Sequence, residues 1–132
     1  MTPLELQLTL ETTLSSIDDI PPIIYENTGQ TPPNEIFIES TIRPVADERQ
    51  ALGTSGPRAI HSGAWWIYVI DPLVRGTSTA LTEAERIRPY FTATTLDVGH
   101  GSVYMDVPQI SRLGRLAKGY TVAIRIDYKY YS

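Results

Sequence analysis

The stretch that most constrains the fold is Ala64–Ile70, in which every side chain is apolar or aromatic. Polar and apolar residues do not alternate along it, which is typical of a central β-strand covered on both faces. The run is also far shorter than the ~18 residues that a membrane-spanning helix needs. We therefore expect a buried central strand whose second face is covered either by a layer of helices or by a neighbouring subunit.

Further strands are indicated by alternation or by turn residues. Residues 36–43 carry apolar side chains at alternate positions, and residues 122–130 do so more clearly. Ile23–Tyr25 is a short extended run, and residues 94–98 and 102–107 flank a Gly-His-Gly turn that is typical of a hairpin. Because turn signals separate neighbouring segments, we expect mostly antiparallel pairing.

Two capping boxes mark the expected starts of helices. Thr2-Pro3-Leu4-Glu5 begins the first helix, and Thr82-Glu83-Ala84-Glu85 offers the second box. Prolines at 21 and 22 end the first helix, and the second ends or kinks near Pro89. The core-facing stripes repeat at helical spacing and consist of Leu6, Leu10, Leu14 and Ile17, and of Ala80, Ala84, Ile87 and Phe91.

The order of these elements predicts an α+β fold in a single domain spanning residues 1–132. We expect a mostly antiparallel sheet of four to six strands with two helices packed on one face. The segment 44–63 is rich in charged residues and glycine, and it is longer than connections without a function usually are in a compact domain. It forms either a long projecting loop or hairpin, or a stretch that only a partner orders.

Charge is distributed unevenly along the chain. Residues 1–49 hold nine acidic and two basic side chains, whereas residues 50–132 hold six acidic and nine basic ones. Opposite signs either pair within one subunit or meet head to tail between subunits. The net charge of -4 and the lack of a Lys/Arg cluster argue against sequence-specific nucleic-acid binding. The first 30 residues carry five acidic side chains and no apolar signal core, so we expect neither export nor a membrane partner.

Candidate catalytic and metal-binding residues are few. The chain has no cysteine, which excludes thiolate chemistry, and neither His61 nor His100 has a partner at the spacing of a catalytic pair or metal site. The acidic pairs Asp18-Asp19 and Asp47-Glu48 fit no calcium loop, and Gly53–Gly56 lacks the lysine of a phosphate-binding loop. We therefore expect no enzyme, no catalytic residue, no metal and no other cofactor.

Several short motifs follow one another in a recognisable order. They are a leucine-rich first helix, Ile24-Tyr25-Glu26-Asn27, Thr31-Pro32-Pro33, Leu52-Gly53, Gly63, Gly76 before a helix ending in Phe91, and the final strand Val122–Tyr128. Together they resemble the tail terminator proteins of long-tailed bacteriophages over nearly the full chain. One link, Asp71–Arg75, is bulkier than the glycine-rich segment expected in that family before the second helix.

The resemblance implies a structural virion protein at the head-proximal end of the tail, assembled in the host cytoplasm. It implies a homo-oligomeric ring, expected to be a hexamer, that caps the tail tube, stops its polymerisation and presents a surface for head joining. The implied partners are the tail tube protein and a head completion or connector protein, with DNA passing through the ring. The alternatives are another neck or head-tail connector completion protein and, more remotely, a small hydrolase or a nucleic-acid-binding domain.

A closed ring needs head-to-tail contacts, because a two-fold patch pairs only with itself. Nine of the eleven basic residues are arginine, a residue enriched at protein interfaces where lysine is depleted. We therefore expect the 44–63 segment of one subunit to meet a basic patch of the next. The candidate interface residues are Asp47, Glu48, Arg49 and Arg58 on that segment, and Arg112, Arg115 and Lys118 on the patch.

Overall fold

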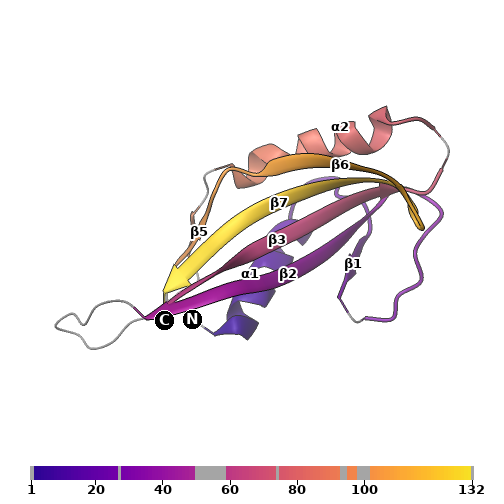
Figure 1. Cartoon of the computed structure of the whole chain (residues 1–132). Helices are drawn as coiled ribbons and strands as arrows, with labels where there is room; N and C mark the ends of the chain where they lie inside the picture. The colour runs from indigo at the N-terminus through magenta and orange to yellow at the C-terminus, as the bar shows by residue number, and fades with distance from the viewer. Residues whose placement is uncertain are drawn as a thin grey trace.

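The computed structural model describes residues 2–26, 28–49, 59–73, 75–92, 95–97 and 102–131. The predicted α+β class is confirmed, and Figure 1 shows the arrangement of its elements. In chain order these are α1 (Pro3–Ser15), β1 (Ile23–Tyr25), β2 (Phe37–Arg49), β3 (Ala59–Asp71), α2 (Ser78–Ile87), the short 3-10 helix η1 (Arg88–Phe91), β4 (Thr95–Asp97), β5 (Ser102–Met105), β6 (Gln109–Leu116) and β7 (Gly119–Tyr131).

Three long antiparallel strands, β2, β3 and β7, form the centre of a seven-stranded sheet. β3 pairs with β2 on one side and with β7 on the other, and β1 adds a short parallel pairing outside β2. The other edge of β7 is shared, because β6 pairs with its first half and β5 with its second half. β4 lies outside β5.

Seven strands exceed the expected four to six, and the strand that the sequence did not indicate is β6. Its side chains are mostly exposed, so the strand shows no alternation of apolar and polar residues. Gly114, which has a positive φ of 82°, and a break in register after Arg112 disrupt the pattern further. Pairing with β7, rather than any pattern of its own, makes this segment a strand.

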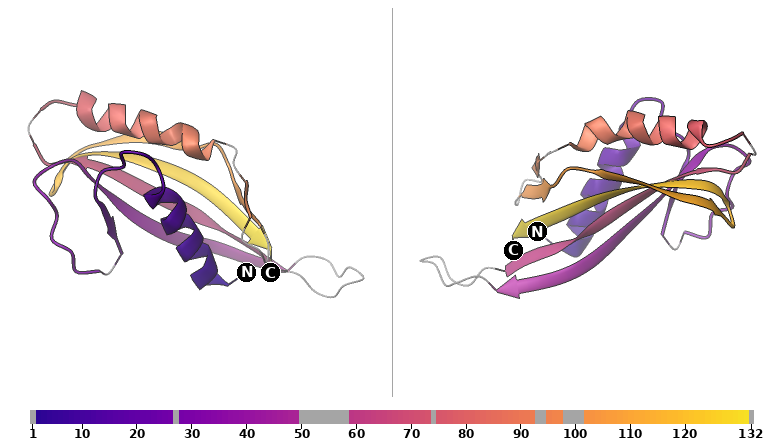
Figure 2. Two further views of the ribbon diagram at one scale, coloured as in Figure 1. Left: turned by 180° about the vertical axis from the view of Figure 1, so that it is seen from behind. Right: turned by 45° about the horizontal axis from the view of Figure 1, so that its top comes forward.

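Both helices lie against the same face of the sheet, as the view from behind in Figure 2 shows. Their buried side chains form one cluster with the strand residues that point toward them. At its centre the Trp65 ring meets Phe91 edge to face, with ring centroids 5.0 Å apart, and the indole N–H donates to the buried Ser40 hydroxyl at 2.8 Å. The cluster includes Leu6, Leu10, Leu14 and Ile17 of the first predicted stripe, and all four residues of the second.

The first helix begins as the sequence predicts but ends early. The Thr2 hydroxyl accepts a hydrogen bond from the Glu5 N–H at 3.2 Å, which confirms the N-cap. The helix ends at Ser15, well before Pro21, and the hydroxyls of Ser15 and Ser16 donate to backbone carbonyls of the last turn. None of the described helices is long and apolar enough to cross a membrane.

The second helix starts at Ser78, so the predicted start at the Thr82 capping box is wrong. A buried carboxylate organises the bulky link that precedes the helix. Asp71 is fully buried, accepts the Leu73 N–H at 3.1 Å and pairs with the Arg75 guanidinium at 3.0 Å. These contacts fix the turn with side-chain hydrogen bonds and need no glycine-rich sequence.

A single arginine joins the two helices. Arg86 of α2 donates to the backbone carbonyls of Asp18 and Asp19, at 2.8 and 2.9 Å, just after α1 ends. Its guanidinium also pairs with Glu83, whose hydrogen bond raises the pKa of Arg86 above its ordinary value. Asp19 has a positive φ of 55°, so Arg86 stabilises a left-handed residue at the turn.

The 44–63 segment is a hairpin arm rather than an unstructured loop over its described part. β2 continues to Arg49 and β3 begins at Ala59, so the two long strands both extend into it. A register shift between Pro44 and Ala46 marks a bulge in β2. The described part of the arm still belongs to the sheet, because residues 60–63 of β3 pair with β7. The arm lies at the end of the sheet where both chain termini are found (Figure 1).

Gly63 lies directly under the side chain of Tyr128, its partner across β3 and β7. A Cβ atom at this position would lie 2.4 Å from the Tyr128 hydroxyl oxygen and 2.6 Å from the Arg43 carbonyl oxygen. Both distances are far inside van der Waals contact. Glycine at 63 is therefore what allows the tyrosine ring to lie flat on the sheet.

Replacing Gly63 with alanine should destabilise the protein by about 1 to 3 kcal/mol, because the added methyl group displaces Tyr128 or the backbone of β2. Chemical denaturation followed by circular dichroism measures the effect. The neighbouring Ser62→Ala variant is the control and should change stability by less than about 1 kcal/mol. Equal stability of Gly63→Ala and the wild type would contradict the close packing.

Replacing Arg86 with lysine should lower the free energy of unfolding by about 1 kcal/mol, or the Tm by about 4 °C. Lysine keeps the positive charge, but it cannot reach both carbonyls and Glu83 with one planar group. Arg88→Lys is the matched control, because Arg88 is exposed and has no ion pair with any described residue. An equal loss in both variants, measured by thermal denaturation, would show that the contacts of Arg86 are not the cause.

Candidate functional site

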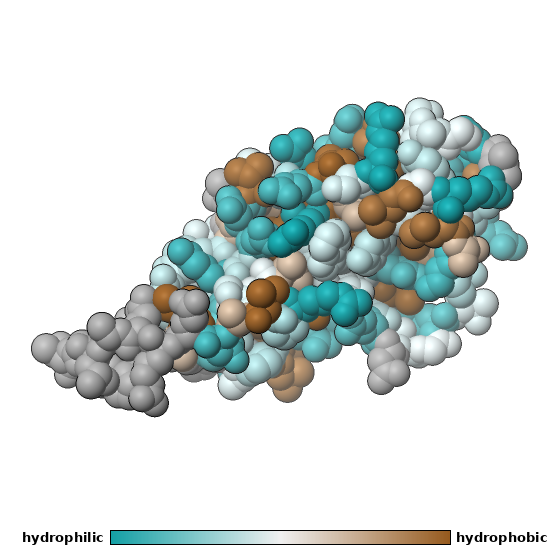
Figure 3. Space-filling model, in the orientation of Figure 1, coloured by the Kyte–Doolittle hydropathy of each residue, from teal (hydrophilic) through white to brown (hydrophobic). Residues whose placement is uncertain are grey.

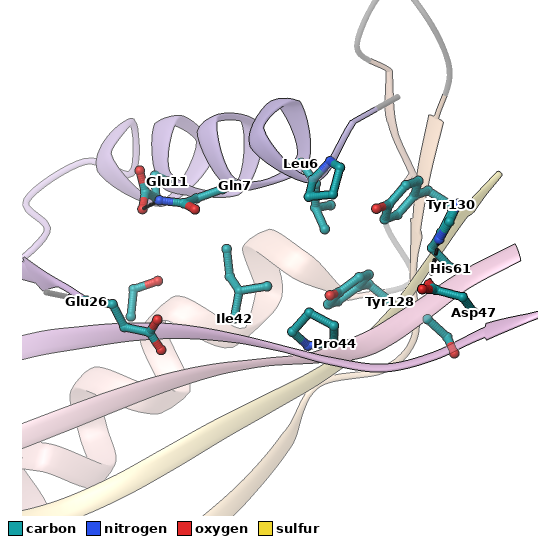
Figure 4. Close-up of a pocket in the computed structure, with 13 residues that line it drawn as sticks. Leu6, Gln7, Glu11, Glu26, Ile42, Pro44, Asp47, His61, Tyr128 and Tyr130 are labelled. Atoms are coloured by element: carbon teal, nitrogen blue, oxygen red, sulfur yellow. Dashed lines mark hydrogen bonds and ion pairs between the residues drawn. The ribbon is translucent and has the colours of Figure 1, made fainter. Parts of the chain in front are cut away.

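A pocket of about 320 Å³ lies between α1 and the helix-bearing face of the sheet, near the base of the β2–β3 arm (Figure 4). Five separate segments line it, which the fold brings together from both ends of the chain. The lining residues are Pro3, Leu6, Gln7 and Glu11 from α1, Glu26 after β1, Ser40, Ile42, Pro44 and Asp47 from β2, His61 and Ser62 from β3, and Tyr128 and Tyr130 from β7.

The charged groups of the pocket are mostly acidic. Three carboxylates, those of Glu11, Glu26 and Asp47, line it, and none of the 13 lining residues is lysine or arginine. The Asp47 carboxylate lies 2.6 Å from the Nδ1 atom of His61. The contact is a hydrogen bond when the imidazole is neutral and an ion pair when it is protonated. Glu11 accepts from the side-chain amide of Gln7 at 3.1 Å.

Stacked aromatic rings form one wall of the pocket. The rings of Tyr128 and Tyr130 lie 6.4 Å apart at an interplanar angle of 15°, and His61 stacks on Tyr130 at 4.8 Å. Each tyrosine is only 4% exposed. Their hydroxyl groups point into the space between α1 and β2 in Figure 4, and neither is hydrogen-bonded to any described residue.

The electrostatic environment disfavours further negative charge in the pocket. Burial, together with the neighbouring Tyr130 and Asp47, raises the pKa of Tyr128 to about 12. Burial and then Asp47 also raise the pKa of Tyr130. Burial and then Glu11 raise the pKa of Tyr25 on the adjoining strand. Each tyrosine therefore stays neutral at ordinary pH and can accept or donate a hydrogen bond.

A second charged surface lies at the opposite end of the sheet, on the β6–β7 hairpin. A bulge at Leu113 shifts the register, so that Arg112 lies opposite Val122 and Arg115 opposite Tyr120. Both of these β7 residues pack into the cluster under the helices. Directly paired residues share a face, so both arginines project from the helix-bearing side.

The two arginines of this hairpin are exposed and form no ion pair with any described residue. Lys118, the third member of the expected basic patch, differs from them because its ammonium group pairs with Glu39 of the same subunit. Of the expected acidic side, Asp47 pairs with His61 in the pocket. Glu48 and Arg49 pair through their backbones with β3 residues.

Arg58 lies outside the described residues, as does His100. Those expected interface residues that the structure describes therefore form two groups at opposite ends of one sheet. Asp47 lies beside β7 near Tyr130, whereas Lys118 is in the turn that leads into Gly119 and Tyr120 at the other end of that strand. Their separation is compatible with contact between subunits and excludes direct contact within one subunit.

The sequence did not predict that Glu11, Glu26, Tyr128 and Tyr130 line one pocket, although Glu26 belongs to a motif of the family resemblance. The alternation of residues 122–130 indicates which side chains share a face with the core, and Tyr128 and Tyr130 do lie in the core cluster. Nothing in the local sequence places α1 above these tyrosines. Among the described residues no group of three or more His, Cys, Asp or Glu side chains is arranged to hold a metal ion.

The face of the sheet away from the helices carries a different pattern, seen in Figure 3 as apolar side chains among polar ones. Trp66 and Tyr68 stack with ring centroids 6.0 Å apart, and the Arg125 guanidinium lies 5.5 Å from the Trp66 ring centroid. No helix of the described chain lies on this face (Figures 1 and 2). The helices thus cover one face of β3. That a neighbouring subunit covers its other face stays a prediction.

Comparison with solved structures finds the same fold in other proteins. One chain, whose name describes no function, superposes with a TM-score of 0.76 at 21% identity, over 98% of this chain and 96% of the other. A chain from the virion of a native gene transfer agent particle superposes with a TM-score of 0.55 at 16% identity, over 96% and 92%. A search of curated proteins finds no match.

A family model described as "Phage tail terminator protein" matches residues 5–128, nearly the whole chain. Proteins of this family are structural parts of the virion tail. The match confirms the expected structural role, the absence of an enzymatic function and the location in the tail of a virion. The chain belongs to the phage tail terminator protein family.

Proposed function

We propose that this protein closes into a ring on the finished tail tube, stops further addition of tube subunits and provides the surface to which the head joins. The observation that carries the proposal is the placement of unlike charges at opposite ends of one sheet. Asp47 lies at the arm, and the unpaired Arg112 and Arg115 lie on the β6–β7 hairpin. We expect six subunits in the ring.

Head-to-tail assembly follows from this placement. Two surfaces that differ in charge and lie at different ends of a subunit can each pair with a different copy, one on either side, which is the head-to-tail arrangement that we propose. If the rotation from one subunit to the next divides a full turn evenly, the chain of contacts closes. A closed ring leaves no free surface for another copy of itself, which suits a protein that ends a polymer.

The proposed subunit contact joins the arm of one subunit to the hairpin of the next. Asp47, Glu48, Arg49 and Arg58 belong to the arm side, and Arg112, Arg115 and Lys118 to the hairpin side. Arg112 and Arg115 contribute most, because Lys118 already has Glu39 as a partner within the subunit. The proposed partners of the ring are the tail tube protein on one side and a head completion or connector protein on the other, with DNA passing through its centre.

Tails assembled without this protein should grow beyond their normal length, because nothing closes the end of the tube. Electron microscopy of negatively stained tails gives the length distribution, and infection assays report head joining. Addition of the purified protein should restore the normal length. Normal, head-competent tails in its absence would refute the proposal, and a ring of twelve subunits by native mass spectrometry would favour a connector protein.

Reversing both hairpin charges in the double variant Arg112→Glu/Arg115→Glu should weaken subunit association by roughly tenfold or more, or about 1.4 kcal/mol per contact. Native mass spectrometry and sedimentation measure the assembled fraction. Higher salt should reduce the difference from the wild type, because screening weakens exposed charge contacts.

The control for this experiment is Arg43→Glu/Arg88→Glu, which changes the net charge equally. Arg43 and Arg88 are exposed and form no ion pair with any described residue. If both double variants lose assembly to the same extent, net charge is responsible. If the hairpin variant assembles as the wild type does, the proposed contact is wrong.

A further inference from the structure

The pocket beneath α1 presents polar groups that have no partner within the subunit. The Tyr128 and Tyr130 hydroxyls belong to side chains that are 96% buried, point into the pocket and have no hydrogen-bond partner among the described residues. The hydroxyl oxygens themselves remain open to the pocket, because neither is among the fully buried unpartnered polar atoms of the described chain. The pocket therefore offers two hydroxyl groups to a polar group from outside the subunit.

The chemistry of the lining specifies a cation. Glu11, Glu26 and Asp47 would repel an anion, and no lysine or arginine is present among the lining residues to neutralise them. The Tyr128 and Tyr130 hydroxyls that point into the pocket can accept hydrogen bonds from the N–H groups of a cation. Among protein cations, a guanidinium group fits best, because its planar fork carries five N–H donors for carboxylates and hydroxyls.

The chain itself supplies such a group, but only from another copy. Arg115 is exposed and unpaired, and it lies opposite Tyr120, eight residues before Tyr128 on the same strand. Eight residues of β-strand span roughly 26 Å, far beyond the reach of one arginine side chain. An arginine on this hairpin can fill the pocket of a neighbour and cannot fill its own.

We propose that the pocket under α1 binds the guanidinium group of Arg115 from the β6–β7 hairpin of a second copy of the chain. Arg115 is the nearer of the two arginines to the hairpin turn, which lets it enter the pocket, while Arg112 stays at the rim facing the Asp47 carboxylate. Asp47 suits this position because its side chain is 73% exposed. This inference rests on the proposed head-to-tail ring and names the residues through which one subunit holds the next.

Disulfide trapping tests the contact directly. The chain has no native cysteine, so any disulfide reports only the introduced pair. The variant Asp47→Cys/Arg112→Cys leaves Arg115 and the tyrosines intact and places one thiol on each side of the contact. Oxidation of the free protein and of assembled tails should yield a ladder of linked chains on a non-reducing gel.

The matched control is Glu85→Cys/Arg112→Cys, which keeps the hairpin thiol and moves the other to an exposed position on α2. Its linked fraction should be lower by about tenfold. No ladder from Asp47→Cys/Arg112→Cys in either free protein or tails, or equal ladders from both variants, would overturn the inference. The proposed function would stand in that case if these tails keep their normal length.

A double-mutant cycle tests the pocket itself. Arg115→Ala should weaken association by roughly tenfold, and Arg115→Lys should restore little of it, because an ammonium group lacks the planar fork. In the Arg115→Ala background, Tyr128→Phe should have almost no further effect on association, because the Tyr128 hydroxyl has already lost the guanidinium group that it binds. Tyr104→Phe, a change at a tyrosine that is 42% exposed, is the control and should leave association unchanged. Simple additivity of Arg115→Ala and Tyr128→Phe would overturn the inference.

Discussion

Strand β3 is paired with β2 on one side and with β7 on the other along nearly its whole length, and the remaining elements are arranged around these three strands. Their helix-facing side chains form the surface on which α1 and α2 pack. The same pairing sets the distance between the arm and the β6–β7 hairpin, because both lie at the ends of these strands. A rigid sheet therefore fixes how far apart the two proposed contact surfaces are, which a closed ring requires.

Elements whose own residues determine their structure could be predicted from the sequence. Thr2 caps α1 through its hydroxyl, and the run 64–70 has no alternative to a central strand. The second helix was harder, because it begins at Ser78 without a side-chain cap, and the Thr82 capping box lies inside it. β6 was missed because only its partner β7 makes it a strand. The sequence thus predicts the core and the short strands β1, β4 and β5, and it misses the one strand that has no pattern of its own.

The candidate site could not be predicted in the same way, since its residues come from five segments that meet only after folding. The uneven charge of the two halves of the sequence indicated contacts without saying where. Pairing within one subunit is observed, and pairing between subunits stays a prediction. Lys118 and Glu39 join the two halves within one subunit, whereas Arg112 and Arg115 find no partner among the described residues and remain available to a neighbour.

The outer borders of the sheet have a further consequence for a protein that is proposed to end a polymer. β1 and β4 are three residues long, and β6 is bulged. The outer edge of β2 beyond Ser40 pairs with no described strand, but it contains Pro44 and a bulge. The chain leaves the edge of β7 between β5 and β6. Long, straight, unpaired strands invite other strands to add to them indefinitely, and short or bulged ones do not. Growth by strand addition is thus disfavoured at both borders. Subunits therefore associate through side-chain contacts. Such contacts can set a fixed rotation between neighbours, so that a ring closes and no further subunit is added.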